Sequence, residues 1–425
     1  MELAIVIGFA VLALFGLRLF AVIGGLALIL YLLADIGDIE GVVNEMYTLA
    51  TQPVLLAIPL FTFAGYLMAE SKAPARLVQL SHALVAPMPG GLAVVALVSC
   101  AFFTAFTGAS GVTIIALGGL LLPVLVSGRY SERFTLGLLT TSGSLGLLFP
   151  PSLAIILYGL IAGVSINQLF VAGVLPGILL IVLLSFYAVA RGGVARADRL
   201  RWEWAKIRKA VWAARLEIPI PIVVLVGIYG GYLTVTDSAA VVAVYVLVIE
   251  VFVHRDIPWR KLPDLIKEAA VLVGGIFIII CTAKALTYYL VDQEVPQGIL
   301  EWMQTYIHSR ITFLIVLNIF LIIVGCLMDI FSAILVVVPL ITPIAEGFGV
   351  DPVHLGIIFL VNLEIGYSTP PVGLNLFIAS FRFGKPITSL YRASLPFLAI
   401  LLAALMIITY VPDLSLLLIE LFGVT

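Results

Sequence analysis

The sequence predicts an all-α polytopic membrane protein made of two inverted-topology repeats, each with five spans and one re-entrant helical hairpin. Three observations carry this prediction. Of the 425 residues, 63% are hydrophobic and 11% are charged, which lies outside the range of soluble domains. Long apolar runs are broken by short clusters of Gly, Ser, Thr and Pro. The same pattern of prolines and glycines also occurs twice along the chain.

The repeated pattern has a constant offset of 220 positions. Pro150-Pro151 recurs at this offset as Pro370-Pro371. The other matched pairs are Pro123 with Pro343, Gly146 with Gly366, and Leu175-Pro176 with Leu395-Pro396. Several prolines and a glycine at one spacing indicate an internal duplication.

The first repeat is predicted to cover residues 1–190. Two apolar runs parted by Arg18 are followed by an acidic surface helix, a span, a basic surface segment, a hairpin, a broken span and a final span. In chain order these segments are 3–17, 19–33, 35–50, 52–70, 72–84, 91–126, 132–162 and 168–189. The hairpin and the broken span hold the Gly- and Ser-rich interruptions.

A basic connector is predicted at residues 191–215. It holds eight Lys and Arg residues against Asp198 and Glu203, with three tryptophans among them. Basic residues and indoles beside membrane spans are typical of an interfacial cytoplasmic segment. A nucleic-acid-binding patch is the alternative, which the shortness of the segment and its flanking spans disfavour.

The second repeat is predicted to cover residues 216–411, followed by a C-terminal tail at 412–425. It repeats the order of the first, with amphipathic surface segments beside spans, one hairpin and one broken span. In chain order the segments are 216–233, 238–253, 257–269, 271–290, 292–307, 312–345, 352–380 and 393–411.

The charge distribution gives an independent test of the orientation. Five crossings is an odd number, so the second repeat must be inverted relative to the first. With 191–215 inside, the Lys and Arg residues near other span ends also fall inside, and the acidic loops 35–50 and 292–301 fall outside. Hairpin 91–126 then enters from the cytoplasm and hairpin 312–345 from the outside. Their tips are expected to meet near the midplane.

Broken helices at the middle of a membrane are typical of secondary transporters. Backbone groups freed from a helix in lipid need partners, so such breaks persist only where they are buried or line a cavity. A helix that ends offers carbonyls to a cation, and a helix that begins offers N–H groups to an anion. Two facing tips of this kind predict a site for coupling cations and an anionic substrate.

The breaks carry motifs that resemble a known family. These are G-A-S at 108–110, S-L-G-L-L-F-P-P-S at 144–152 and N-L-E-I-G-Y-S-T-P-P-V-G-L-N-L-F at 362–377. They are similar to the large membrane subunit of TRAP transporters, the tripartite ATP-independent periplasmic carriers, and the resemblance covers essentially the whole chain. It implies a sodium-driven elevator importer of organic acids in a bacterial or archaeal cytoplasmic membrane. Its implied partners are a periplasmic binding protein and a small four-helix membrane subunit, here expected as a separate chain.

The resemblance also implies site residues. The first sodium site would be formed by Gly108, Ser110, Thr113, Ser142, Gly143 and Ser144. The second would be formed by Asp329, Ser332, Asn362, Gly366 and Thr369. The substrate, such as a C4-dicarboxylate or sialic acid, would lie between the tips at Ser110, Ser144, Asp329, Glu364, Pro150 and Pro370. Sodium prefers hard oxygen ligands, which hydroxyls and free backbone carbonyls supply.

The mechanism implied by the resemblance divides the chain into two parts. The first three spans of each repeat and the surface segments would form a static scaffold. The hairpins, the broken spans and the last span of each repeat would form a transport domain that slides across the membrane.

Simpler roles for the same residues remain open. Ser and Thr in membrane helices often bond to the carbonyl four residues earlier or join helices, and the prolines can be purely structural. Acids in apolar sequence, such as Asp329 and Glu364, are costly and usually functional, although a protonated acid bonded within the protein also fits Glu364.

Other function classes find less support in the sequence. No nucleophile elbow, zinc-protease motif or P-loop occurs, and the cysteines and histidines lack transition-metal spacing, so neither an enzyme nor an ATP-driven pump is expected. A channel fits two closed hairpin tips less well than alternating access does. The closest alternative is a stand-alone sodium- or proton-coupled anion symporter that needs no binding protein.

Overall fold

The protein is almost entirely helical. The structure, a computed structural model, describes residues 51–85, 90–191 and 203–423, together with residues 5, 8–9, 11–12, 17, 19–33, 43–44 and 46–48. Most of the predicted run 3–17, most of the surface helix 35–50 and residues 192–202 of the connector lie outside these residues. Within the described ranges every regular element is a helix.

Eight helical segments in the described part of the chain are long and apolar enough to cross a membrane. The number becomes nine when a bent pair, Glu132–Leu148 and Leu153–Ala162 at 48° to one another, is counted as one broken span. These segments confirm the predicted class of an all-α polytopic membrane protein.

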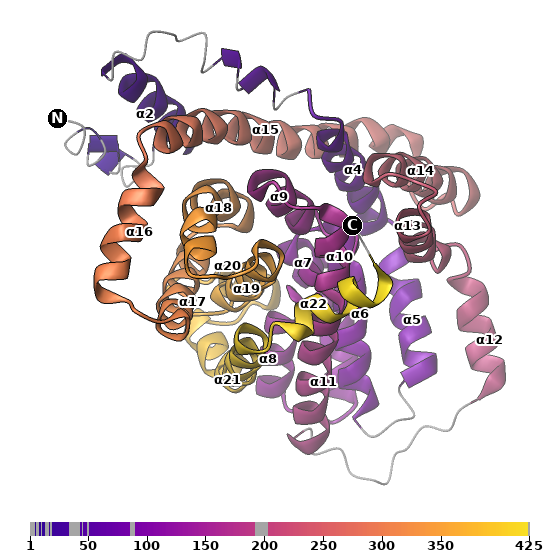
Figure 1. The fold of residues 1–425 in the computed structure, drawn as a ribbon. Helices are drawn as coiled ribbons and strands as arrows, with labels where there is room; N and C mark the ends of the chain where they lie inside the picture. Colours follow the sequence, from indigo (N-terminus) through magenta and orange to yellow (C-terminus); the bar gives the residue numbers. More distant parts are fainter. Residues whose placement is uncertain are drawn as a thin grey trace.

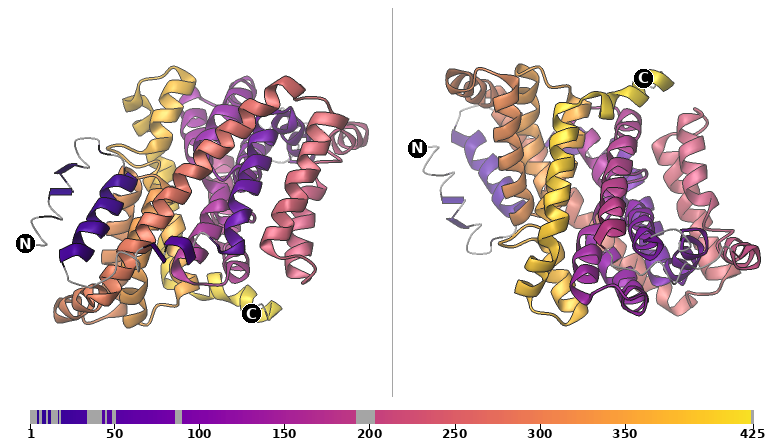
Figure 2. Two further views of the ribbon diagram at one scale, coloured as in Figure 1. Left: turned by 90° about the horizontal axis from the view of Figure 1, so that it is seen from above. Right: turned by 90° about the horizontal axis from the view of Figure 1, so that it is seen from below.

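Outer helices border a central bundle on three sides, and α21 and α11 of the bundle form its remaining edge (Figure 1). In this view α15 runs along one side of the bundle, α16 lies at one end of α15, and α12 to α14 lie on the side away from α16. Figure 2 shows that α15 crosses the other helices obliquely. The outer helices are α2 (Leu19–Leu33), α4 (Ala57–Glu70), α5 (Ala73–Val85), α12 (Trp204–Ala213), α13 (Pro219–Tyr229), α14 (Val235–Leu247), α15 (Leu262–Asp292) and α16 (Val295–Tyr306).

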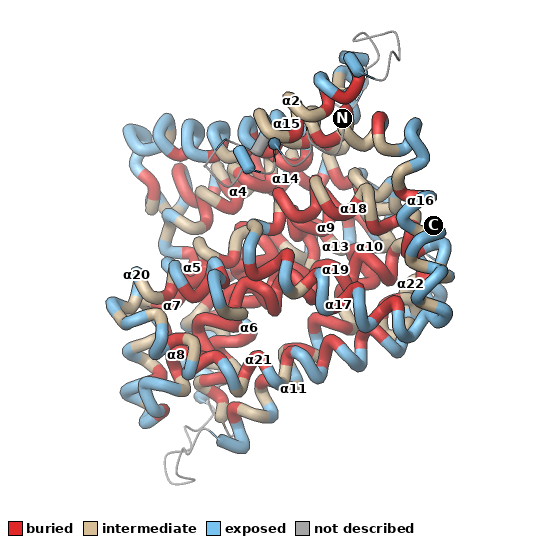
Figure 3. Tube along the Cα trace, turned by 90° about the vertical axis from the view of Figure 1, so that its left-hand side faces the viewer, coloured by how far each residue is buried: buried red, intermediate tan, exposed pale blue. Residues whose placement is uncertain are grey.

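The central bundle holds the broken helices and most of the buried residues (Figure 3). From the first half it contains α6 (Gly91–Thr107), α7 (Ser110–Ser127), α8 (Glu132–Ser142), the 3-10 helix η2 (Leu145–Leu148), α9 (Leu153–Ala162), α10 (Ile166–Ala172) and α11 (Val174–Arg191). From the second half it contains α17 (Arg310–Leu327), α18 (Ile330–Gly347), α19 (Pro352–Gly366), α20 (Leu374–Phe383), α21 (Ile387–Tyr410) and α22 (Asp413–Phe422).

The helix α15 differs from the sequence prediction. A surface helix at 257–269 and a separate span at 271–290 were expected, but one helix runs from Leu262 to Asp292. Its only proline, Pro263, lies in the first turn, where the missing N–H leaves no helical hydrogen bond unmade. No residue after Pro263 forces a break, so the amphipathic segment continues directly into the span.

The C-terminal tail also contains a helix that the sequence analysis did not predict. In α22, most apolar side chains are partly or fully exposed, but Ser415 is buried. This helix packs against α10, α11 and α19 of the central bundle. The last part of the chain therefore belongs to the core assembly.

Each half of the chain contains a helical hairpin that packs against the other half. The first, α6–α7, turns at Gly108, whose φ of 64° is in the left-handed region that favours glycine. The second, α17–α18, turns at Met328 and Asp329. The second helix of the first hairpin packs against α20, and the second helix of the other hairpin packs against α9. Each hairpin thus contacts the broken span of the other half.

The outer helices are joined by a buried cluster of charges. The guanidinium of Arg76 in α5 donates to Glu217, to Glu250 at 2.9 and 3.0 Å, and to Asp256 at 2.6 Å. Lys72 lies 3.7 Å from Asp256 and His254 lies 3.6 Å from Glu217. Because Arg76 belongs to the first half and its three carboxylates to the second, this cluster holds the two halves together outside the bundle.

Candidate functional site

The first helix break brings together oxygen atoms from three helices. The hydroxyl of Thr104 in α6 lies 2.6 Å from that of Thr113 in α7 and 2.7 Å from the carbonyl of Gly143, just after α8. A carbonyl can only accept, so Thr104 donates to Gly143 and Thr113 donates to Thr104. Both threonines are fully buried. The structure therefore joins the predicted residues Thr113 and Gly143 through Thr104, which the sequence analysis missed.

Two glycines allow the backbones of this break to approach closely. A Cβ atom at Gly143 would lie 2.6 Å from the side chain of Ile114 and 3.3 Å from the carbonyl oxygen of Ser110. At Gly146 it would lie 2.2 Å from the carbonyl oxygen of Ala101 in α6. At Gly146 only a residue without a side chain fits against the backbone of α6, whereas at Gly143 the side chain of Ile114 would have to move.

Ser110 connects the tip of the first hairpin to the second broken span. Its hydroxyl donates to Oδ1 of Asn375 in α20 at 2.7 Å, and the backbone N–H of Asn375 donates to the carbonyl of Tyr367. Ser110 and Asn375 are both buried. Asn375 lies inside the 362–377 motif but is not among the predicted site residues.

The remaining predicted residues of the first break lie nearby but make weaker contacts. Ser144 donates to the carbonyl of Thr141 at 3.4 Å. The hydroxyl of Ser142 is buried beside the thiol of Cys100 in α6. Gly108 packs against Leu153, where a Cβ atom would lie 2.7 Å from the leucine side chain.

At the second hairpin tip, Asp329 acts as the N-cap of α18. Its Oδ1 accepts from the backbone N–H groups of Phe331 and Ser332 at 3.0 and 3.1 Å, and its Oδ2 accepts from the Ser332 hydroxyl. Such a cap satisfies N–H groups that the first turn of a helix leaves unpaired. Asp329 is exposed. Within the described residues, no hydrogen bond links Asp329 or Ser332 to the other predicted members of the second site.

The other predicted residues of the second site lie in α19 and in the turn that follows it. Asn362 is fully buried and donates from Nδ2 to Asn318 Oδ1 at 2.7 Å and to the Ile358 carbonyl at 2.8 Å. Thr369 donates to the carbonyl of Ile365, four residues earlier, which is a common local role for threonine. A Cβ atom at Gly366 would lie 2.5 Å from the carbonyl carbon of Gly325, so α19 and α17 touch backbone to backbone.

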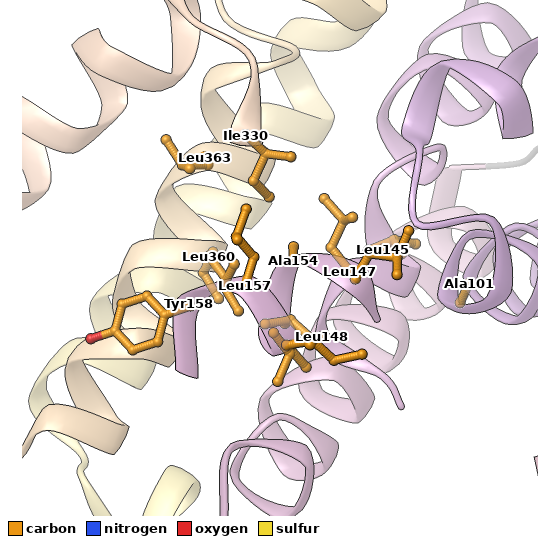
Figure 4. Close-up of a cluster of buried hydrophobic side chains, with 14 of the residues drawn as sticks. Ala101, Leu145, Leu147, Leu148, Ala154, Leu157, Tyr158, Ile330, Leu360 and Leu363 are labelled. Atoms are coloured by element: carbon orange, nitrogen blue, oxygen red, sulfur yellow. The ribbon is translucent and has the colours of Figure 1, made fainter. Parts of the chain in front are cut away.

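The region between the breaks is filled by apolar side chains (Figure 4). Leu147 and Leu157 of the first break and Ile330 at the second tip belong to one buried cluster. Pro150 is buried and Pro370 is partly exposed, and each forms a cis peptide bond with the proline that follows. Glu364 is buried, and neither of its carboxylate oxygens has a hydrogen-bond partner among the described residues.

Comparison with known proteins decides the family. Residues 6–414 match the family described as "Tripartite ATP-independent periplasmic transporter, DctM component". The chain belongs to this family: it is a TRAP transporter large membrane subunit. As a TRAP large subunit it is an inner-membrane transport protein and not an enzyme, as the sequence analysis predicted.

Individual relatives agree with this assignment. The chain is 37% identical over 385 residues to the C4-dicarboxylate TRAP transporter large permease protein DctM of Pseudomonas aeruginosa, covering 89% of each chain. It is 36% identical over 364 residues to the isethionate TRAP transporter permease protein DctMQ of Oleidesulfovibrio alaskensis, covering 84% of this chain and 57% of that protein. TRAP large permeases work with a small membrane subunit and a periplasmic binding protein, and the second relative is a fused protein.

A solved structure shares the fold of this TRAP subunit. The crystal structure of the Alcanivorax borkumensis YdaH transporter superposes with a TM-score of 0.62 at 16% sequence identity, covering 92% of this chain and 90% of that one. At this level of identity the similarity concerns the fold alone.

Proposed function

We propose that this TRAP subunit is the translocating part of a sodium-coupled importer of organic acids. The observation that carries the proposal is the group of neutral oxygen atoms at the two breaks. The first break gathers the hydroxyls of Thr104 and Thr113 and the carbonyl of Gly143. The second break holds the amide oxygen of Asn362, for which the described residues supply no hydrogen-bond donor. Buried, uncharged, hard oxygen atoms at broken helices suit sodium.

The proposed first sodium site comprises Gly108, Ser110, Thr113, Ser142, Gly143 and Ser144, now joined by Thr104. The proposed second site comprises Ser332, Asn362, Gly366 and Thr369, with Asp329 shaping the tip as the cap of α18. The substrate would bind between the tips, near Ser110, Ser144, Asp329, Glu364, Pro150 and Pro370. Since apolar side chains fill this region (Figure 4), substrate binding requires the hairpins to move.

An anionic substrate is proposed from the relatives and from the helix ends. The two relatives described above are named for C4-dicarboxylate and for isethionate, which are both organic acids. The helices α7 and α18 begin at the two tips, and the N-terminal end of a helix favours negative charge. Carboxylates such as C4-dicarboxylates or sialic acid therefore fit the proposed site.

The proposed transport movement is of the elevator type. The hairpins, the broken spans and the last spans of the two halves pack together in the central bundle, and the outer helices border this bundle on three sides (Figure 1). In this proposal the outer helices stay fixed with the small subunit, and the central bundle slides with sodium and substrate.

The test is uptake into proteoliposomes that contain this chain and its small subunit. Radiolabelled organic acids would be offered with an inward sodium gradient or with potassium, and with or without the periplasmic binding protein. Uptake that requires both sodium and the binding protein supports the proposal. Uptake with sodium but without the binding protein would replace it by the stand-alone symporter, and uptake that ignores sodium would overturn the coupling.

Single substitutions then test the two sites in the same assay. Replacing Ser110 by Ala removes its bond to Asn375 across the halves, so a higher half-saturating sodium concentration is expected. Replacing Thr369 by Ala removes only a local bond to the carbonyl of Ile365 at the end of α19, unless the hydroxyl also binds sodium. Unchanged sodium dependence in both variants would overturn the assignment of these residues.

A further inference from the structure

Five buried polar residues are linked by hydrogen bonds from the second break to the C-terminal helix, with Thr409 taking part through its hydroxyl on one side and its backbone carbonyl on the other. The chain runs from Asn362 in α19 to Asn318 in α17 at 2.7 Å, and from Asn318 to the Thr409 hydroxyl in α21 at 3.2 Å. His354 contacts the Thr409 carbonyl at 3.3 Å and the Ser415 hydroxyl in α22 at 3.2 Å. The exposed fraction of each of these residues is 2% or less.

The donors and acceptors of this chain have one consistent direction. The Ile358 carbonyl can only accept, so the nitrogen of the Asn362 amide must face it and Asn318. Asn318 then presents its oxygen to Asn362 and its nitrogen to the Thr409 hydroxyl. By the same reasoning, Nε2 of His354 carries the proton that is donated to the Thr409 carbonyl.

This direction leaves the oxygen of Asn362 as an acceptor without a donor. No hydrogen-bond partner of this atom occurs among the described residues, although the residue is completely buried. An unsatisfied buried acceptor costs free energy, because it has lost its hydrogen bonds to water and gained none in the protein. A bound cation would remove this cost, since a carbonyl-type oxygen is a natural ligand for it.

We propose that Asn318, Thr409 and His354 are positioning residues that hold the Asn362 oxygen toward a sodium ion. This inference rests on the proposed function and adds a supporting shell to its second site. Asn318 fixes the rotation of the Asn362 amide, Thr409 fixes Asn318, and His354 ties Thr409 to α22. Sodium binding at the second break is thereby coupled to the packing of α21 and α22.

The experiment measures sodium-dependent thermal stabilisation of the purified complex of this chain with its small subunit. Sodium is titrated at constant ionic strength against potassium, and the half-saturating concentration is determined for each variant. Asn318→Leu removes both bonds at similar volume and is expected to raise this concentration by about 10- to 100-fold, as loss of a supporting residue does at other metal sites. Thr409→Val and His354→Leu should raise it progressively less.

Two variants distinguish positioning from general destabilisation. His354→Gln places an amide N–H near the position of Nε2 and should restore most of the sodium affinity lost in His354→Leu. Thr342→Val removes a buried hydroxyl of α18 that bonds to the Val338 carbonyl and contacts Tyr158, and that has no bond to any residue of this hydrogen-bonded chain. It should leave the half-saturating concentration unchanged.

Each outcome decides between the inference and the function on which it rests. An unchanged value in Asn318→Leu together with a raised value in Asn362→Ala would overturn the positioning role and leave the sodium site in place. Unchanged values in both would overturn the second sodium site itself, and no sodium effect on the parent protein would overturn both. If Asn318→Leu does not fold, Thr409→Val and the two His354 variants decide in the same way.

Discussion

The two helix breaks share a backbone plan and differ in chemistry. In both, a glycine at matching positions, Gly146 and Gly366, lies against the backbone of the first helix of its hairpin. The first break then carries hydroxyl groups, Thr104 and Thr113, where the second carries the amides of Asn318 and Asn362. The glycines determine how closely the helices approach at each break. The polar residues, which differ between the two halves, determine which oxygen and nitrogen atoms lie at each break.

The breaks also differ in exposure. At the first tip Gly108 and Ser110 are buried, while at the second tip Asp329 is exposed. In the broken spans, Pro371 and Val372 are exposed, whereas the matching Pro151 and Ser152 are buried. In a transporter that opens its site to one side of the membrane at a time, the two breaks are expected to differ in exposure in any single conformation. The comparison therefore predicts that substitutions of the shared glycines damage folding, and that substitutions of the unshared polar residues change ion binding.

The largest expected effect comes from adding a methyl group at the shared glycines. A Cβ atom would lie 2.2 Å from the Ala101 oxygen in Gly146→Ala and 2.5 Å from the Gly325 carbonyl carbon in Gly366→Ala. Both contacts are with backbone atoms, so helices must shift, at a cost of about 1–3 kcal/mol or more. Thermal unfolding of the purified protein, with the yield of monodisperse material, measures the loss.

Gly274→Ala is the matched control for these two variants. Gly274 is also a helical glycine, in α15, but a Cβ atom there would meet no other atom within 4 Å. Its replacement is expected to be neutral or to stabilise the helix by up to about 1 kcal/mol. Equal stability of all three variants would contradict the view that the shared glycines set the helix spacing.

The next largest effect is expected at Asp329, and it separates a structural from an ionic role. Asp329→Ala removes the cap of α18 and should cost about 0.5–2 kcal/mol of stability. Asp329→Asn keeps an oxygen for the N–H groups of Phe331 and Ser332 and removes the charge. If the cap is its main role, Asp329→Asn will bind sodium normally, and a raised half-saturating sodium concentration would instead make Asp329 a ligand.

The sequence located the breaks better than it located the atoms around them. Glycines and prolines interrupt apolar runs visibly, so the ends of α6 and α17 lie close to the predicted interruptions. Thr104, Asn318 and Asn375 were missed because they lie within helices, and nothing local shows which neighbour they face. Asn318 did carry a signal, since an amide inside an apolar run needs a partner, but the partner is 44 residues away.

The continuous helix α15 shows a second limit of sequence reasoning. The division at residue 270 followed from the change between an amphipathic and a fully apolar pattern. Such a change marks a different environment around the chain and does not by itself end a helix. The helix continues because no proline follows Pro263 within α15, so no backbone hydrogen bond of the helix is interrupted.

A smaller effect is expected from Thr104, which tests the chemistry of the first break. Thr104→Val keeps the shape of the side chain and removes the bonds to Thr113 and to the Gly143 carbonyl. We expect a several-fold higher half-saturating sodium concentration with stability reduced by about 1 kcal/mol. The control is Thr140→Val, which removes an equally buried hydroxyl that bonds only to the Leu136 carbonyl. Equal sodium affinity in the two variants would exclude Thr104 from the site.

The smallest expected effect lies outside the breaks and concerns pH. Neither break contains an ion pair among the described residues, whereas the outer cluster holds Arg76 against three carboxylates. Burial and the nearby Arg76 hold the pKa of His254 below its ordinary value of 6.5, with Arg215 acting in the same direction and Glu217 and Asp256 opposing. Because the pKa of His254 is lower in the folded protein than in the unfolded chain, His254 is protonated in the unfolded chain at a higher pH than in the folded protein.

Stability should therefore decline as the pH falls below about 6.5, until the folded-state pKa of His254 is passed. In His254→Gln this part of the decline is expected to disappear, so unfolding temperatures at about pH 7.5 and about pH 5.5 should differ less than in the parent protein. Sodium affinity should stay unchanged in this variant, because the cluster joins outer helices and contacts neither break. An identical decline in both proteins would show that the pH dependence arises elsewhere, with the buried Glu364 of the second break as the next residue to replace.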